Sequence, residues 1–244
     1  MRYLAILRYG PDTPEFEPGT PEFEADLARY ERFGEVAGDA VAGGAALDLP
    51  RRAVSVRHDG GGSTLVTDGP YAETAEVVGG LYVLEAATLD DALELARQNP
   101  AAEDGSVELR PVMEWSDRSG EPGAVPLGAD RYLALLWGRE TAADIPGTPE
   151  WGASLAEHER FGEEAGDAVL GGGALHPAST ATTVRVRDGE GLLTDGPYAE
   201  TAEVLGGGSV YAAATGDEAT ALARRIPMDP GGVVEVRRIL ELGS

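Results

Sequence analysis

An acidic loop that occurs twice carries the side chains best suited to chemistry. The stretch from Thr67 to Val77 recurs without a change from Thr194 to Val204. Its carboxylates can accept hydrogen bonds or protons, and its tyrosine ring can stack on a ligand while the hydroxyl donates. The candidate ligand-binding residues of the two loops are Asp68, Tyr71, Glu73, Asp195, Tyr198 and Glu200.

The same loop also has a purely structural interpretation. In an Asp-Gly-Pro sequence the aspartate can accept amide hydrogens of its own loop, the glycine supplies unusual dihedral angles, and the proline fixes the exit. Identity between two copies whose other segments have drifted shows that the loop is constrained. Turn geometry, an interface between the halves and ligand binding are all compatible with that constraint.

Several kinds of protein-borne site are excluded by composition. The chain has no cysteine, which rules out disulfides, thiolate nucleophiles, zinc–thiolate sites and iron–sulfur clusters. Its three histidines, His58, His158 and His176, show no pair at ligand spacing. We therefore expect neither a metal site nor a cofactor.

Charge and hydropathy limit the partners. The formal net charge is -24, and the arginines stand singly or in pairs, whereas a nucleic-acid surface needs a concentrated basic stripe. The first apolar run, Met1 to Leu7, is far shorter than the roughly 20 residues of a membrane span. We expect a cytoplasmic protein that binds neither nucleic acid nor membrane.

The whole chain is one module written twice. Arg2-Tyr-Leu-Ala recurs at Arg131, Gly19-Thr-Pro-Glu recurs at Gly147, and Val107-Glu-Leu-Arg corresponds to Val234-Glu-Val-Arg. A period of this length indicates duplication of a domain and not a solenoid. The expected organisation is a first module at 1–116, a glycine- and proline-rich linker at 117–130, and a second module at 131–244.

Each module has a readable order of elements. Thr20 followed by Pro21 starts a helix, and Gly43-Gly44 ends that region. Asp59-Gly-Gly-Gly is a hairpin turn between strands, and Thr88 opens a second helix through a capping box. With strands at 3–9, 53–57, 63–67, 80–85 and 107–113, the order is β-α-β-β-β-α-β, an α+β ferredoxin-like pattern with an added hairpin.

A ferredoxin-like sheet has helices on one face only, so its other face needs a cover. The tandem copy can supply it, and we predict that the halves pack sheet to sheet as an intrachain pseudo-dimer. Strand ends would then open onto a cleft between the sheets. Arg8 and Trp137, near the ends of the first strand of each copy, become candidate residues for an anionic aromatic ligand, or else Arg8 is a plain surface arginine.

The repeated motif Asp68-Gly-Pro-Tyr-Ala-Glu-Thr-Ala-Glu76 resembles that of YCII-related proteins with a DGPF domain. The resemblance covers nearly all of both halves, although Tyr71 and Tyr198 replace the usual phenylalanine and Ala75 and Ala202 replace the usual lysine. It implies a ferredoxin-like fold that pairs into a dimeric α+β barrel. A few relatives are lyases or dehydrohalogenases, and DGPF proteins often accompany sigma factors.

The resemblance also implies an acid–base pair. Relatives have a histidine on the first helix and an aspartate near its end, and His158 and Asp167 fit these positions. A neutral imidazole beside a carboxylate can accept and return a proton near neutral pH. Alternatively, His158 is a helix-surface residue that contacts Glu157 or Ser154.

These observations favour a small-molecule-binding protein or a cofactor-independent acid–base enzyme of the isomerase, lyase or cyclase type, with a cleft between the modules. The alternative is a non-catalytic regulatory or protein-interaction module that acts with a sigma factor. A structural duplication without a cleft is the third hypothesis. The pseudo-dimer is compatible with a monomer or a homodimer.

Overall fold

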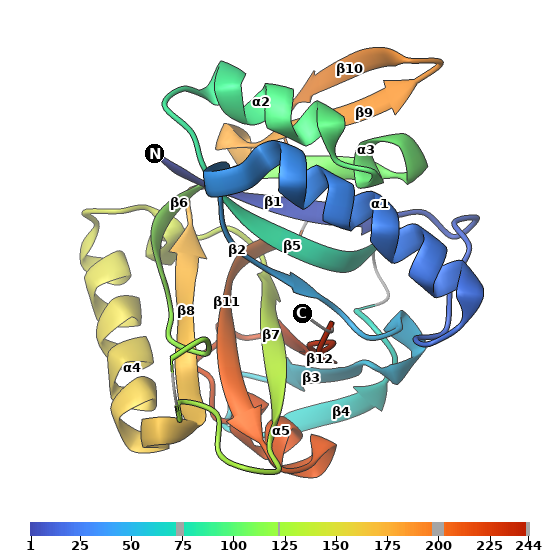
Figure 1. Ribbon diagram of the computed structural model, residues 1–244. Helices are drawn as coiled ribbons and strands as arrows, with labels where there is room; N and C mark the ends of the chain where they lie inside the picture. Colours follow the sequence, from blue (N-terminus) through green and yellow to red (C-terminus); the bar gives the residue numbers. More distant parts are fainter. Residues whose placement is uncertain (72–75, 122, 197–202, 243–244) are drawn as a thin grey trace. The chain divides into compact units, whose positions relative to one another are not determined.

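The computed structural model describes residues 1–71, 76–121, 123–196 and 203–242 (Figure 1). The chain forms two compact units. Unit 1 comprises Met1–Leu49, Thr74–Pro111 and Ser179–Glu200, and unit 2 comprises Pro50–Glu73, Val112–Ala178 and Thr201–Ser244. Neither unit is continuous in sequence, so the division by compactness differs from the division into sequence copies.

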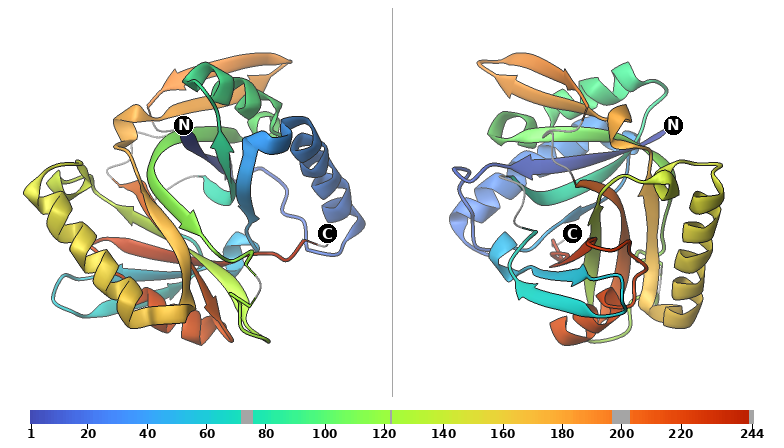
Figure 2. Two further views of the ribbon diagram at one scale, coloured as in Figure 1. Left: turned by 60° about the vertical axis from the view of Figure 1, so that its left-hand side comes forward. Right: turned by 180° about the vertical axis from the view of Figure 1, so that it is seen from behind.

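Unit 1 contains an antiparallel sheet in the order β2-β5-β1-β6-β9-β10. Its helices lie along one face (Figure 1), and the hairpin of β9 and β10 lies beside α2 and α3 (Figure 2). The elements are β1 (Arg2–Tyr9), α1 (Pro21–Ala37), η1 (Gly38–Ala40), β2 (Val41–Ala46), β5 (Val77–Glu85), α2 (Leu89–Gln98), α3 (Ala101–Asp104), the first half of β6 (Ser106–Asp117), β9 (Thr182–Arg187) and β10 (Glu190–Asp195).

Unit 2 repeats this sheet in the order β8-β11-β7-β12-β3-β4, with the second half of β6 added beyond β8. All pairings are antiparallel. The elements are η2 (Pro50–Arg52), β3 (Val54–His58), β4 (Thr64–Asp68), β7 (Asp130–Gly138), η3 (Ala142–Asp144), α4 (Pro149–Ala165), η4 (Gly166–Ala168), β8 (Val169–Leu175), β11 (Val204–Ala213), α5 (Gly216–Ala223) and β12 (Val233–Arg238), and η5 (Ala178–Thr180) leads back into unit 1.

The outer hairpin of each sheet comes from the other sequence copy. In unit 1, β6 of the first copy pairs with β9 of the second through Val107↔Val184. In unit 2, β12 of the second copy pairs with β3 of the first through Val234↔Val56. Because Val107 and Val234 are equivalent, the two units have the same register, and each copy completes the sheet of the other.

The helix starts follow from local chemistry. The Thr20 and Thr148 side chains accept the amide hydrogens of Phe23 and Trp151, and a proline follows each cap. Thr88 forms the predicted capping box with Asp91. The helix starts predicted at Thr20 and Thr88 are confirmed.

Strand alternation decides which side chains meet the helices. In unit 1 the core against the helices contains Tyr3, Ala5, Leu7, Val107 and Leu109, all almost fully buried. In unit 2 the corresponding core includes Tyr132, Ala134, Val234 and Val236 with Phe161 of α4. Residues between these positions therefore point to the opposite face of each sheet.

One strand in each copy was missed from the sequence. The region of Gly43-Gly44 was expected to end a helical segment, but it forms β2, and its counterpart forms β8. Glycine has low strand propensity, yet β8 needs it: a Cβ on Gly173 would lie 1.9 Å from the Glu114 carbonyl oxygen. Close backbone approach explains glycine where propensity alone argues against a strand.

The architecture is thus α+β, mostly antiparallel sheet with few helices, as the sequence predicted. None of the helices in the described parts of the chain is long and apolar enough to cross a membrane.

Candidate functional site

A buried group of charged side chains lies on the face of the unit 1 sheet opposite the helices. Arg8 is near the end of β1, directly across from Ser106 of β6. Glu108 and Arg110 follow on the same face, because Val107 and Leu109 point into the helix-side core. The alternation of two adjacent strands therefore brings these polar residues together.

Glu108 is the centre of this group. Its Oε2 accepts hydrogen bonds from Nε and Nη2 of Arg8, both at 2.9 Å, and its Oε1 lies 3.4 Å from Nη1 of Arg110. The exposed fractions of the three side chains are 1%, 7% and 1% for Glu108, Arg8 and Arg110. Burial of charges costs free energy unless they are paired, and here Glu108 pairs with both arginines. Charged residues are rarely this buried, which makes the group a candidate functional site.

The hairpin from the second copy extends the group. Arg185 of β9 places Nη2 3.5 Å from Oε1 of Glu76. The Ser106 hydroxyl donates to the other oxygen of Glu76 at 3.4 Å. We call the six residues Arg8, Glu76, Ser106, Glu108, Arg110 and Arg185 the Arg8 cluster.

The equivalent region of the unit 2 sheet carries different side chains. Trp137 stands across from Val233, as Arg8 stands across from Ser106, so Trp137 replaces Arg8 and Val233 replaces Ser106. Glu235 and Arg237 keep the pair, with 3.1 Å between Oε1 and Nη1. The structure thus makes Arg8 and Trp137 equivalent positions.

An aromatic stack fills this region of unit 2. The Tyr71 ring lies on Trp137 with 5.8 Å between centroids and 27° between planes. The Tyr71 amide donates to Oε2 of Glu235 at 3.1 Å, and the guanidinium carbon of Arg57 lies 5.7 Å from the ring centroid. Tyr71 and Trp137 are only 4% and 3% exposed.

The remaining loop residues have different environments. Asp68 and Asp195 are exposed, and among the described residues neither side chain forms a hydrogen bond. The turn is held instead by Gly69, whose amide donates to the Ala53 carbonyl at 2.8 Å and whose φ of +95° favours glycine. Glu73, Tyr198 and Glu200 lie outside the described residues.

His158 and Asp167 are not joined in the described chain. His158 lies half-buried on α4, and burial lowers the pKa of its imidazole while Glu157 opposes this shift. Asp167 lies in η4, fully exposed, with Oδ1 3.5 Å from Nη2 of Arg118. No hydrogen bond or ion pair between His158 and Asp167 occurs among the described residues, so their acid–base role stays a prediction.

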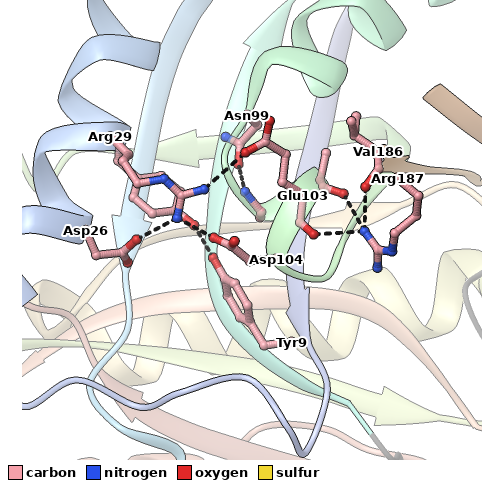
Figure 3. A network of polar contacts seen from close by, with 11 residues as sticks. Tyr9, Asp26, Arg29, Asn99, Glu103, Asp104, Val186 and Arg187 are labelled. Carbon is pink, nitrogen blue, oxygen red and sulfur yellow. Dashed lines mark hydrogen bonds and ion pairs between the residues drawn. The ribbon is translucent and has the colours of Figure 1, made fainter. Parts of the chain in front are cut away.

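A second polar network lies on the helix side of unit 1 (Figure 3). The Tyr9 and Tyr30 hydroxyls share a short hydrogen bond, and burial raises the pKa of both. Arg29 of α1 binds Asp26 at 3.0 Å and Asp104 at 2.5 Å. Because the phenols are held neutral and the charges are matched, we interpret this network as structural.

Arg187 connects the exchanged hairpin to this region. Its Nη1 donates to the carbonyls of Ala102 and Glu103 at 3.2 and 2.8 Å (Figure 3). Its Nη2 donates to the Gly105 carbonyl at 3.1 Å. These are carbonyls at the end of α3, where a cation is favourable.

Among the described residues no three His, Asp or Glu side chains are grouped as ligands for an ion.

Comparison with known proteins agrees with the repeat. A model of the YCII-related domain matches residues 1–116 and again residues 133–243. An uncharacterized protein of Rhizobium meliloti (strain 1021) is 38% identical over 82 residues, which are 32% of this chain and 60% of that protein. The match therefore spans less than two thirds of the relative.

Proposed function

Because this chain belongs to the YCII-related family in both of its copies, we propose that it is a small-molecule-binding protein whose ligand site is the Arg8 cluster of unit 1. The ligand class that suits the cluster is a small carboxylate. The observation that carries this proposal is the presence of Arg8 where unit 2 has Trp137.

The two units differ at this position in a way that bears on ligand binding. In unit 2 the Tyr71 and Trp137 rings stack in this region, whereas in unit 1 Arg8 contacts Glu108, which also contacts Arg110. Guanidinium groups are the side chains best suited to carboxylate recognition. In a chain of net charge -24, this cluster is where an anion is best supported.

We also keep the pseudo-dimer and its cleft as a proposal. The helix-free faces carry apolar residues such as Leu4 and Ile6 in unit 1 and Leu133 and Leu135 in unit 2, each at most 1% exposed. Apolar sheet faces of this kind are stable only when covered. Turnover is a separate proposal, for which His158 and Asp167 remain the predicted acid–base pair.

The test is calorimetric titration with benzoate, a carboxylate probe, and with benzamide, a neutral compound of similar shape. We expect benzoate to bind more tightly than benzamide. Arg8→Met should weaken benzoate binding at least about tenfold, which corresponds to a loss of about 1.4 kcal/mol of binding free energy. Arg8→Lys keeps the charge beside Glu108 but not the planar fork, so it should give an intermediate loss.

Arg2→Met is the matched control, because Arg2 lies on β1 as Arg8 does but forms an exposed ion pair with Glu85 of β5. It should leave benzoate binding unchanged. Equal binding of benzoate and benzamide, or wild-type affinity in a folded Arg8→Met protein, would refute the proposal.

A further inference from the structure

The hairpin that ends in the Asp-Gly-Pro-Tyr loop is the element exchanged between the copies. Residues 54–68 of the first copy form the outer strands of unit 2, and residues 182–195 of the second copy form those of unit 1. Val54 and Thr182 hold equivalent places, because each pairs with the aspartate of its loop, Asp68 or Asp195. The similar sequences Val54-Ser-Val-Arg57 and Val184-Arg-Val-Arg187 would instead align Val54 with Val184, two residues away from this equivalence.

Backbone contacts fasten each exchanged hairpin. In unit 2 the His58 amide donates to the Gly232 carbonyl at 2.9 Å, the Gly231 amide donates back to His58 at 2.7 Å, and Arg57 Nη1 donates to the Gly231 carbonyl at 3.0 Å. Arg187 makes the corresponding carbonyl contacts in unit 1. An arginine on each hairpin therefore holds the segment that precedes the last strand of the other copy.

Tyr71 of the loop adds contacts with side chains of the other copy. The amide of Tyr71, from the first copy, donates to the buried carboxylate of Glu235, from the second copy, and the Tyr71 ring packs on Trp137 of the second copy. Three constraints were compatible with the loop sequence. These contacts favour the interface between copies, and the turn at Gly69 shows that turn geometry also constrains the loop.

We propose that the hairpin with its Asp-Gly-Pro-Tyr loop is a reciprocal docking element, and that the unit 1 site is composite. The first copy supplies Arg8, Glu108 and Arg110, and the second copy supplies Arg185. The partner that each copy fits is therefore a second YCII-type copy that offers the same hairpin. The ligand part of this inference rests on the proposed function, whereas the docking part does not.

Tandem fusion has a consequence in this scheme. A homodimer of one copy would contain two identical units, both with arginine or both with tryptophan at the position of Arg8 and Trp137. Fusion lets the two units differ, so that one stays charged while the other becomes an aromatic stack.

Engineered cysteines test the docking, since the natural chain has none. Val54 and Val236 are cross-strand partners, and such partners lie about 4.5–5.5 Å apart at Cα, within reach of a disulfide. Full-length V54C/V236C should oxidise to an intramolecular disulfide. The matched control T182C/V236C places a cysteine at the equivalent position of the other hairpin and should stay reduced. The reverse pattern would overturn the exchange.

Benzoate titration of Arg185→Gln and Arg57→Gln then tests the composite site. Loss of benzoate affinity by about tenfold or more in R185Q only is expected, because Arg57 is the equivalent residue of unit 2. Equal affinities in the two variants would overturn the composite site. Failure of wild-type protein to bind benzoate would instead defeat the proposed function and leave the disulfide result standing.

Discussion

Replacement of Glu108 by glutamine should destabilise unit 1 strongly. The change keeps the shape of the side chain but removes the charge that two arginines share at 2.9 and 3.4 Å, with all three side chains at most 7% exposed. Removal of one partner from a buried ion pair costs about 3–5 kcal/mol, because the remaining charges stay buried.

The matched control is Glu85→Gln. Glu85 lies 2.8 Å from Arg2, a shorter contact, but the two side chains are 48% and 52% exposed. Exposed pairs contribute about 0–1 kcal/mol, because water screens them. Burial, and not distance, should therefore separate the two variants.

Urea unfolding followed by far-UV circular dichroism measures the difference. With a slope of about 2 kcal/mol per molar urea, E108Q should lower the midpoint by about 2 M and E85Q by less than about 0.5 M. Tryptophan emission reports the unfolding of unit 2, since Trp115, Trp137 and Trp151 all belong to it. In E108Q the urea midpoint followed by tryptophan emission should therefore move less than the midpoint followed by circular dichroism. Similar small losses in both variants would refute the account of the Arg8 cluster.

Three further predictions concern other parts of the structure. Tyr71→Phe should raise the unfolding free energy by about 1 kcal/mol, because the buried Tyr71 hydroxyl has no hydrogen-bond partner among the described residues; a loss in denaturant titration would contradict this. His158→Gln should flatten the dependence of stability on pH. Burial lowers the pKa of the His158 imidazole in the folded state, so the unfolded state binds the proton at a higher pH than the folded state does. The stability of the wild-type protein should therefore fall as the pH drops below about 6.5, whereas that of the variant should not fall for this reason. Urea midpoints at about pH 7.5 and about pH 5.5 check it, and equal slopes in both proteins would count against it. Gly173→Ala should cost about 1–3 kcal/mol, since its Cβ would lie 1.9 Å from the Glu114 carbonyl oxygen, whereas Gly43→Ala meets no atom within 4 Å and should stay within about 0.5 kcal/mol in thermal unfolding.

Local signals in the sequence predicted much of the fold. Thr20 and Thr88 cap helices as expected, because capping depends on residues three positions apart, and Thr148 in the repeat of the Thr20 sequence does the same. The Asp59 turn is also local, and its carboxylate accepts the amides of Gly61 and Ser63. The strands at Gly43 and Gly173 were missed because glycine has low strand propensity, and at Gly173 the glycine is explained only by the Glu114 backbone, which is distant in sequence.

The pairing of hairpins could not be predicted from the repeat. A hairpin has the same sequence whether it pairs with a strand of its own copy or with one of the other copy. The pairing depends on which last strand, β6 or β12, lies beside the hairpin in the folded chain. The repeated Val-Glu-x-Arg at Val107 and Val234 was visible, but it served only to show duplication. A buried Glu and Arg on one strand face would have been a signal for the site, because charged residues are rarely placed inside a sheet without a partner.

Backbone NOEs in a deuterated, ¹⁵N-labelled sample test the reciprocal docking most directly, because they require no substitution. The account predicts cross-strand contacts between β12 and β3, for instance Val234 with Val56, and between β6 and β9, for instance Val107 with Val184. Contacts that join β6 with β3 and β12 with β9 would contradict it.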